Sequence, residues 1–136
     1  MRFVYTVLAV SIFLVLFSCK KNSELRTSSS VSWKNCTLVE DKTDHVNVCL
    51  DSLIGDSRCP LEVVCIWQGT AIAKFSVTVN DHQQPVTLST FKLPGFPSDT
   101  ILMGYKIEFV DLLPYPDINK SHDISEYRAE LKITKQ

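Results

Sequence analysis

The chain has 136 residues, of which 45% are hydrophobic and 21% are charged, and its 14 Lys and Arg residues nearly balance its 15 Asp and Glu residues. The basic residues form no stripe along the sequence, which excludes the electrostatic footprint of a nucleic-acid-binding protein. Residues 31–136 carry no internal repeat and suffice for one domain with its own hydrophobic core.

Residues 1–18 are typical of a secretory signal peptide. Arg2 gives a charged start, and the apolar run from Val4 to Phe17, at about 14 residues, is shorter than the roughly 20 residues that cross a bilayer. Leu16 and Ser18 precede Cys19 at the spacing that resembles the lipobox of bacterial lipoproteins. The resemblance implies cleavage before Cys19 and acylation of that cysteine, so that an N-terminal lipid holds the protein on a membrane.

The polar segment of residues 19–30 is predicted to be a flexible tether between the lipid and the domain. Beyond the lipidated cysteine its only apolar residue is Leu25, which is too little apolar surface to order the segment by burial. Lys20 follows the cysteine, where an aspartate retains many lipoproteins in the inner membrane. The resemblance to lipoproteins therefore implies the outer membrane, and we expect the periplasmic face because the tether lacks an acidic run.

Alternation of apolar and polar residues predicts six or seven strands and no long helix in residues 31–136. In chain order, the strands are expected at residues 33–39, 46–50, 71–79, 86–90, 105–110 and 127–134. Residues 80–85 are polar and predict a hairpin turn, and residues 121–126 predict a short helix at most. Many short strands favour an all-β fold, either an antiparallel β-sandwich or a small barrel.

Four cysteines remain after Cys19, and an oxidising compartment favours disulfides among them. Three pairings are open, of which we expect Cys59–Cys65, closing a short loop around Pro60, and Cys36–Cys49, joining neighbouring strands. A structural zinc site and a redox site are the alternatives. Both favour the closely spaced C-x2-C pair, which the chain lacks, so we predict no metal and no other cofactor.

Four loop residues are candidates for binding. Arg58 either forms an ion pair with Asp56 or Glu62 or serves as the reactive residue of a protease-inhibitor loop. Trp67 is expected to pack over the disulfide or into the core, with ligand stacking as the alternative. Phe96 and Tyr115 lie on loops that contain prolines; they either plug the ends of the fold or form a contact surface, since stiff loops lose little entropy on binding.

Several segments also resemble a group of small bacterial lipoproteins of uncharacterised function. Residues 56–69 read DSRCPLEVVCIWQG and resemble that group's motif D-S-R-C-P-x(4)-C-[IV]-W-x-G. The similarity continues through YKIEF (105–109), LLPYP (112–116) and YRAEL (127–131). Members of the group commonly have a small residue at the position of Gln68 and lack the counterpart of the Cys36–Cys49 pair, so the resemblance supports only the 59–65 disulfide and implies no activity.

No catalytic constellation is recognisable. The sequence lacks G-x-S-x-G and H-E-x-x-H motifs, and His45, His82 and His122 lie in three separate polar segments. We therefore expect a non-enzymatic binding or accessory module with a periplasmic or envelope protein as its partner. The alternative is an inhibitor of a secreted hydrolase, a protease or lysozyme, acting through the 56–65 disulfide loop.

Overall fold

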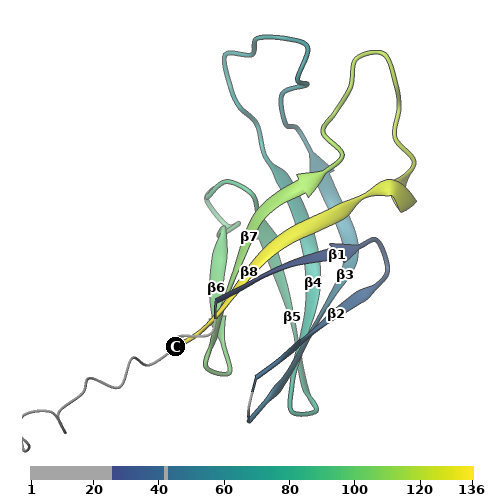
Figure 1. The fold of residues 1–136 in the computed structure, drawn as a ribbon. Helices are drawn as coiled ribbons and strands as arrows, with labels where there is room; N and C mark the ends of the chain where they lie inside the picture. The colour runs from purple at the N-terminus through teal and green to yellow at the C-terminus, as the bar shows by residue number, and fades with distance from the viewer. Residues whose placement is uncertain (1–25, 42) are drawn as a thin grey trace, which may run out of the picture.

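Eight strands make up nearly all of the regular structure in the computed structural model, which describes residues 26–41 and 43–136. They form two four-stranded antiparallel sheets, ordered β1-β8-β7-β6 and β2-β3-β4-β5 (Figure 1). The sheets are not closed into a barrel, so the prediction of a β-sandwich is confirmed. The strands are β1 (Arg26–Ser32), β2 (Cys36–Glu40), β3 (His45–Asp56), β4 (Ala71–Val79), β5 (His82–Ser89), β6 (Asp99–Leu102), β7 (Tyr105–Leu113) and β8 (Arg128–Lys135).

The core lies between the inner faces of the two sheets. Strand β4 has the bounds that its alternation predicts, and its inward side chains are buried. Phe75 on β4 meets Phe109 on β7 edge to face, with ring centroids 5.2 Å apart. This contact joins the sheets at the centre of the sandwich, where aromatic pairs add to the stabilisation from burial.

A β-bulge interrupts the regular alternation of β7. The register against β8 shifts between Phe109 and Asp111, and both Phe109 and Leu112 point into the core. Without the bulge, a residue three positions after Phe109 would face outward. The irregularity therefore keeps Leu112 inside and places Asp111 beside the end of the sandwich, where it contributes to the site described below.

Two tight turns explain differences from the predicted strand boundaries. Val79 pairs with His82, so the turn consists of Asn80 and Asp81 alone, both with positive φ (46° and 69°). Such turns match the twist of a hairpin and favour Asn, Asp and Gly. The predicted turn over residues 80–85 was too long, because polar side chains on the solvent face of β5 resemble loop residues. Strand β6, which was not predicted, enters β7 through a similar turn at Met103-Gly104.

The first described strand corrects the predicted domain boundary. Residues 26–30 belong to β1, which pairs with β8 along its length, from Arg26 opposite Thr134 to Ser32 opposite Arg128. The β-sandwich therefore includes residues 26–30, and the predicted tether of residues 19–30 is wrong over these five residues. The predicted signal peptide, Cys19 and the rest of the tether lie outside the described residues.

A polar cluster ties the β2–β3 turn to the end of the chain. Asp44 accepts hydrogen bonds from Asn80 (2.6 Å), Lys135 (2.9 Å) and Tyr105 (2.8 Å). The hydrogen bond from Asn80, followed by those from Lys135 and Tyr105, lowers the pKa of Asp44 far below its ordinary value of 3.8. Burial, together with the bond that it donates to Asp44, raises the pKa of Tyr105 to about 12.

The lowered pKa of Asp44 predicts an acid-sensitive contribution to stability. A carboxylate whose pKa is lower in the folded state stabilises the fold above its unfolded pKa and loses that contribution as the pH falls below it. We expect the free energy of unfolding to decrease as the pH is lowered from ~5 to ~2, and Asp44→Asn to flatten this decrease. Urea unfolding at a series of pH values measures it, with Asp81→Asn in the neighbouring turn as the control. An unchanged slope in Asp44→Asn contradicts the prediction.

Candidate functional site

Two long loops lie side by side at the end of the sandwich opposite to Arg26 and Lys135. The cysteine loop (residues 57–70) joins β3 to β4, and the proline loop (residues 114–127) joins β7 to β8 (Figure 1). The proline loop ends in a single 3-10 turn, Ile124–Glu126, capped by the Asp123 side chain. The short helix predicted within residues 121–126 is thus present as one turn.

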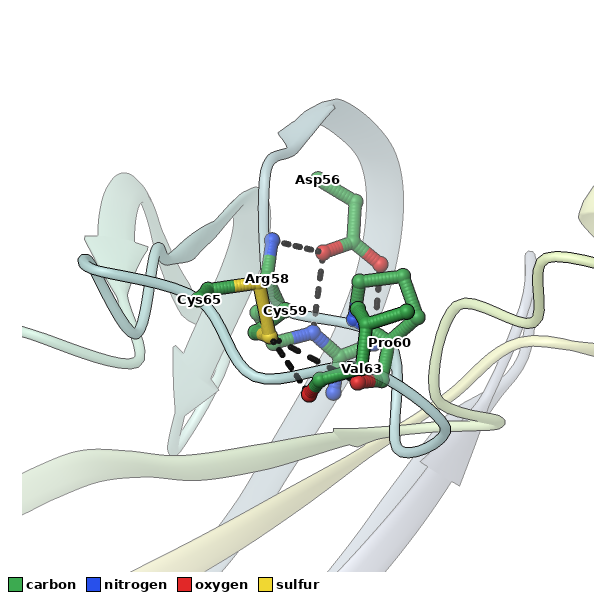
Figure 2. Close-up of a disulfide and its surroundings, with 6 residues drawn as sticks. All are labelled: Asp56, Arg58, Cys59, Pro60, Val63 and Cys65. Atoms are coloured by element: carbon green, nitrogen blue, oxygen red, sulfur yellow. Dashed lines mark hydrogen bonds and ion pairs between the residues drawn. A yellow bond between two sulfur atoms is a disulfide. The ribbon is translucent and has the colours of Figure 1, made fainter.

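The arms of the cysteine loop are fastened together by backbone pairing and a disulfide. The Ser57 N–H donates to the carbonyl of Thr70 (2.9 Å), and the Cys59 N–H donates to the carbonyl of Gln68 (3.0 Å). Beyond this pairing, Cys59 and Cys65 form a disulfide that closes the tip (Figure 2). The predicted pairing is confirmed here and for Cys36–Cys49, which face each other across β2 and β3.

Arg58 anchors the cysteine loop from inside the protein. Its side chain is only 5% exposed and binds the carboxylate of Asp56 through Nε (2.9 Å) and a terminal nitrogen (2.8 Å), as a two-point pair (Figure 2). The other terminal nitrogen donates to Asp111 (3.1 Å) and to the carbonyl of Leu112. The carbonyl of Pro114 accepts another bond (3.0 Å). Such charge-assisted, planar pairs are the geometry for which guanidinium is best suited.

These contacts join the two sheets, because Asp56 ends β3 and Asp111 lies in β7. Tyr115 completes the cluster: its ring lies 4.4 Å from the guanidinium carbon, and its hydroxyl donates to Asp111 (2.9 Å). Burial lowers the pKa of Arg58, but the hydrogen bonds and charge of Asp56, with the charge of Asp111, outweigh burial and raise the pKa above its ordinary value. Burial and the bond to Asp111 raise the pKa of Tyr115. The cluster is therefore a fixed ionic clamp at neutral pH.

The position of Arg58 decides between its two predicted roles. The ion pair with Asp56 is confirmed, whereas a reactive residue of an inhibitor loop must reach out of the protein into an enzyme pocket. The Arg58 side chain points inward, and all of its donor groups have partners within the protein. Arg58 thus holds the loop in place and does not form part of its outer surface.

The outer surface of the cysteine loop is apolar. Val64 is 102% exposed, Ile66 100% and Trp67 83%, with Leu61 at 74% and Val63 at 41%. The prediction that Trp67 packs over the disulfide or into the core is wrong, because its side chain is almost fully exposed, whereas the buried Arg58 occupies the base of the loop. The exposure of Leu61, Val64 and Ile66 was missed. The only signal in the sequence was an apolar run between residues that favour loops. A run of this kind is equally compatible with a buried segment.

The aromatic residues of the proline-containing loops are less exposed. Tyr115 is half-buried over Arg58, and Phe96 is half-buried in the β5–β6 connection, where its backbone pairs with Leu93. Both fit the predicted role of plugging the end of the sandwich. Tyr115 also borders two hollows in the surface, whereas Phe96 borders neither.

These two hollows lie along the base of the cysteine loop. The Phe91 hollow, about 570 Å³, has a mixed lining that includes the apolar residues Leu61, Phe91 and Val110 and the polar residues Gln68 and Thr90. The Arg128 hollow, about 480 Å³, lies between the two loops and is lined by Glu62, Pro116, Asp117, Glu126 and Arg128, among others. Both hollows are open to solvent, and Leu61 and Tyr115 border both of them. The end of the sandwich thus combines projecting apolar side chains with recesses beside them.

Within residues 26–41 and 43–136, no group of His, Cys, Asp and Glu side chains is arranged to hold a metal ion. The same part of the chain contains no helix that is long and apolar enough to span a bilayer. Comparisons of the chain with models of protein families, with curated proteins and with solved structures find no match.

Proposed function

We propose that this protein is an envelope lipoprotein, anchored to the outer membrane through Cys19, whose β-sandwich is a non-enzymatic module that binds a partner protein through the cysteine loop. The observation that carries the proposal is the set of large apolar side chains standing almost fully in solvent on that loop. Exposed apolar patches of this kind, set on a rigid support, mark interaction sites in soluble proteins.

The size of the apolar surface fits a protein partner. The exposed parts of Leu61, Val63, Val64, Ile66 and Trp67 present on the order of 500 Å² of apolar surface. That area is at the upper end of the ~300–600 Å² found for the largest patch on a typical monomer, and it is a large share of the ~800 Å² that each partner contributes to a standard interface.

The construction of the loop also favours binding. The disulfide, the backbone pairing and the Arg58 clamp hold the loop in one arrangement before any partner arrives. A surface ordered in advance loses little conformational entropy when a complex forms. Because Arg58 makes the contacts that hold the loop to the rest of the protein, the apolar side chains remain available for a partner.

The direction of the loop favours a protein over the anchoring membrane as its occupant. Arg26 pairs with Thr134 near one end of the sandwich, whereas Asp56 and Leu113 lie at the other. Strand β7, which runs between these ends, is roughly 27 Å long at ~3.3 Å per residue. A tether that enters the domain at Arg26 therefore presents the cysteine loop away from the membrane that holds the lipid.

We expect a photo-crosslinking amino acid at position 67 to capture a defined protein in intact cells, while the same group at Gln83, on the opposite end, captures none. Trp67→Ala is expected to weaken binding of the captured protein by roughly 30-fold, the effect of losing a Trp hot spot. Its stability should change by less than ~0.5 kcal/mol, because the side chain is solvent-exposed. Binding that survives Trp67→Ala combined with Ile66→Ala would overturn the proposal. Release of Cys19→Ala from the membrane fraction tests the anchor separately.

A second function, inhibition of a secreted protease or lysozyme, is favoured by the projecting shape of the stapled loop. Since Arg58 is buried, the side chains that enter the enzyme's cleft are Ile66 and Trp67. This function therefore requires an enzyme with an apolar subsite. Titration of the protein against a panel of proteases and lysozymes, with Trp67→Ala as the loss-of-contact control, decides it: no inhibition across the panel removes this alternative.

A further inference from the structure

The two hollows are adjacent, because Leu61 and Tyr115 border both of them, and together they are called the groove. An extended chain lying along the base of the cysteine loop could therefore contact both hollows. The exposed side chains of Val64 and Ile66 belong to the same loop. A ligand seated in the groove can therefore extend its apolar contacts onto the loop.

The two hollows differ in charge. The Phe91 hollow has apolar side chains, among them Leu61, Phe91 and Val110, beside the polar residues Gln68 and Thr90. Its two charged groups, Arg58 and Asp111, are bonded to each other at 3.1 Å and satisfied within the clamp. This hollow therefore presents no unpaired charge to a ligand, and apolar groups can cover its apolar side chains.

The Arg128 hollow carries an excess of negative charge. Its carboxylates are Glu62, Asp117 and Glu126, and its only guanidinium is that of Arg128. Among the described residues Glu62 has no ion-pair or hydrogen-bond partner, and Asp117 accepts one bond, from the backbone N–H of Asn119 (2.7 Å). Glu126 pairs with His122 (2.9 Å) and, more distantly, with Lys120 (3.7 Å). The bond from His122 lowers the pKa of Glu126, so this carboxylate is ionised at neutral pH.

The residues of the Arg58 clamp add further negative charge near the groove. Arg58 supplies one positive charge against the two carboxylates of Asp56 and Asp111. The region behind the groove is therefore negative as well. Groups of like charge placed opposite each other across an interface are unfavourable, and complementary charge selects the partner.

We infer that the groove binds an extended segment of the partner protein in which apolar side chains cover the exposed Leu61, Val64 and Ile66 and a Lys or Arg side chain enters the Arg128 hollow, which Glu62 and Asp117 line. The inference rests on the proposed function and adds the chemistry of the partner. An acidic segment is repelled by the carboxylates of Glu62 and Asp117. A basic segment without apolar residues leaves the exposed apolar side chains of the cysteine loop uncovered. The combination of both features distinguishes the preferred segment.

Three synthetic dodecapeptides of matched length test this chemistry: one apolar and basic, one apolar and acidic, and one polar and basic. Their binding to the purified full chain is measured by fluorescence anisotropy at low and high salt. We expect the apolar and basic peptide to bind at least ten times more tightly than either of the others, with an affinity that falls as salt screens the charges.

Glu62→Gln combined with Asp117→Asn is expected to weaken that peptide about 5- to 10-fold, in keeping with the loss of two surface ion pairs. Glu40→Gln combined with Asp81→Asn makes the same change of charge at the far end of the sandwich and should have no effect. Equal affinity for the basic and acidic peptides, or no binding of any peptide, overturns the inference. If crosslinking at position 67 still captures a partner in that case, the proposed function stands; if both fail, both are wrong.

Discussion

Replacing Arg58 with alanine is expected to lower the free energy of unfolding by about 3–5 kcal/mol, the cost of removing one partner from a buried ion pair. The change leaves Asp56 with a buried, uncompensated carboxylate and removes the donor for the carbonyls of Leu112 and Pro114. Asp111 is 30% exposed and recovers some hydration, so it contributes less to the loss. Urea unfolding followed by circular dichroism measures the difference between the variant and the wild type.

The matched control is Arg128→Ala, which removes an exposed arginine near the same end of the sandwich and is expected to change stability by less than ~0.5 kcal/mol. Arg58→Lys keeps the charge but loses the planar, two-point geometry, so an intermediate loss is expected. Equal stabilities for Arg58→Ala and Arg128→Ala would show that the clamp adds no net stability and that the disulfide and the backbone pairing suffice to hold the loop.

Gly69→Ala is the second substitution with a large expected effect. Gly69 has φ of +70°, and a Cβ atom placed there would lie 1.9 Å from the carbonyl oxygen of Ser57 and 2.8 Å from the Cα of Arg58. Both contacts are with backbone, so no side-chain rotation relieves them. We expect a loss of about 3 kcal/mol or more, from the left-handed conformation and the forced separation of the loop's two arms.

Gly95→Ala separates these two causes. Gly95 also has a positive φ (+82°), but a Cβ atom at this position would meet nothing within 4 Å. Gly95→Ala should therefore lower the free energy of unfolding only by the cost of the backbone conformation, ~1–2 kcal/mol. The difference between the two variants in urea unfolding then reports the clash at the base of the cysteine loop. Similar losses for both would mean that the loop arms move apart without cost.

The sequence predicts well those parts of the fold in which burial is regular. Strand β4 alternates strictly because one of its faces lies against the opposite sheet. The sequence predicts residues 26–30 of β1 to belong to the tether because the only large apolar residue of this strand is Val31. Strand β1 forms because β8 offers an unpaired edge, and that is a property of the assembled sheet. Short edge strands such as β6 owe their structure to a neighbour in the same way.

At the candidate site, the disulfides and the ion pair could be predicted from the sequence, but the direction in which the side chains point could not. The number of cysteines and the expected oxidising compartment favour disulfides, and the positions of the cysteines favour the two pairings that the structure shows. An ion pair of Arg58 with Asp56 or Glu62 is expected because these residues are close in the sequence. Whether an arginine or a tryptophan takes the interior position depends on Asp111 and the carbonyl of Pro114, more than 50 residues away in the chain. No local sequence pattern specifies this long-range contact of Arg58. The sequence therefore predicts a buried Trp67 and does not reveal the outward apolar surface of the loop.

The pairing of β1 with β8 also determines how the protein tolerates proteolysis. A protease that cut between Ser30 and Val31 would remove five of the seven residues of β1 and leave most of β8 with free backbone N–H and C=O groups. Unprotected strand edges recruit further strands from other molecules and start aggregation. The serine-rich part of β1 thus protects the edge of β8, and its removal is expected to make the β-sandwich self-associate.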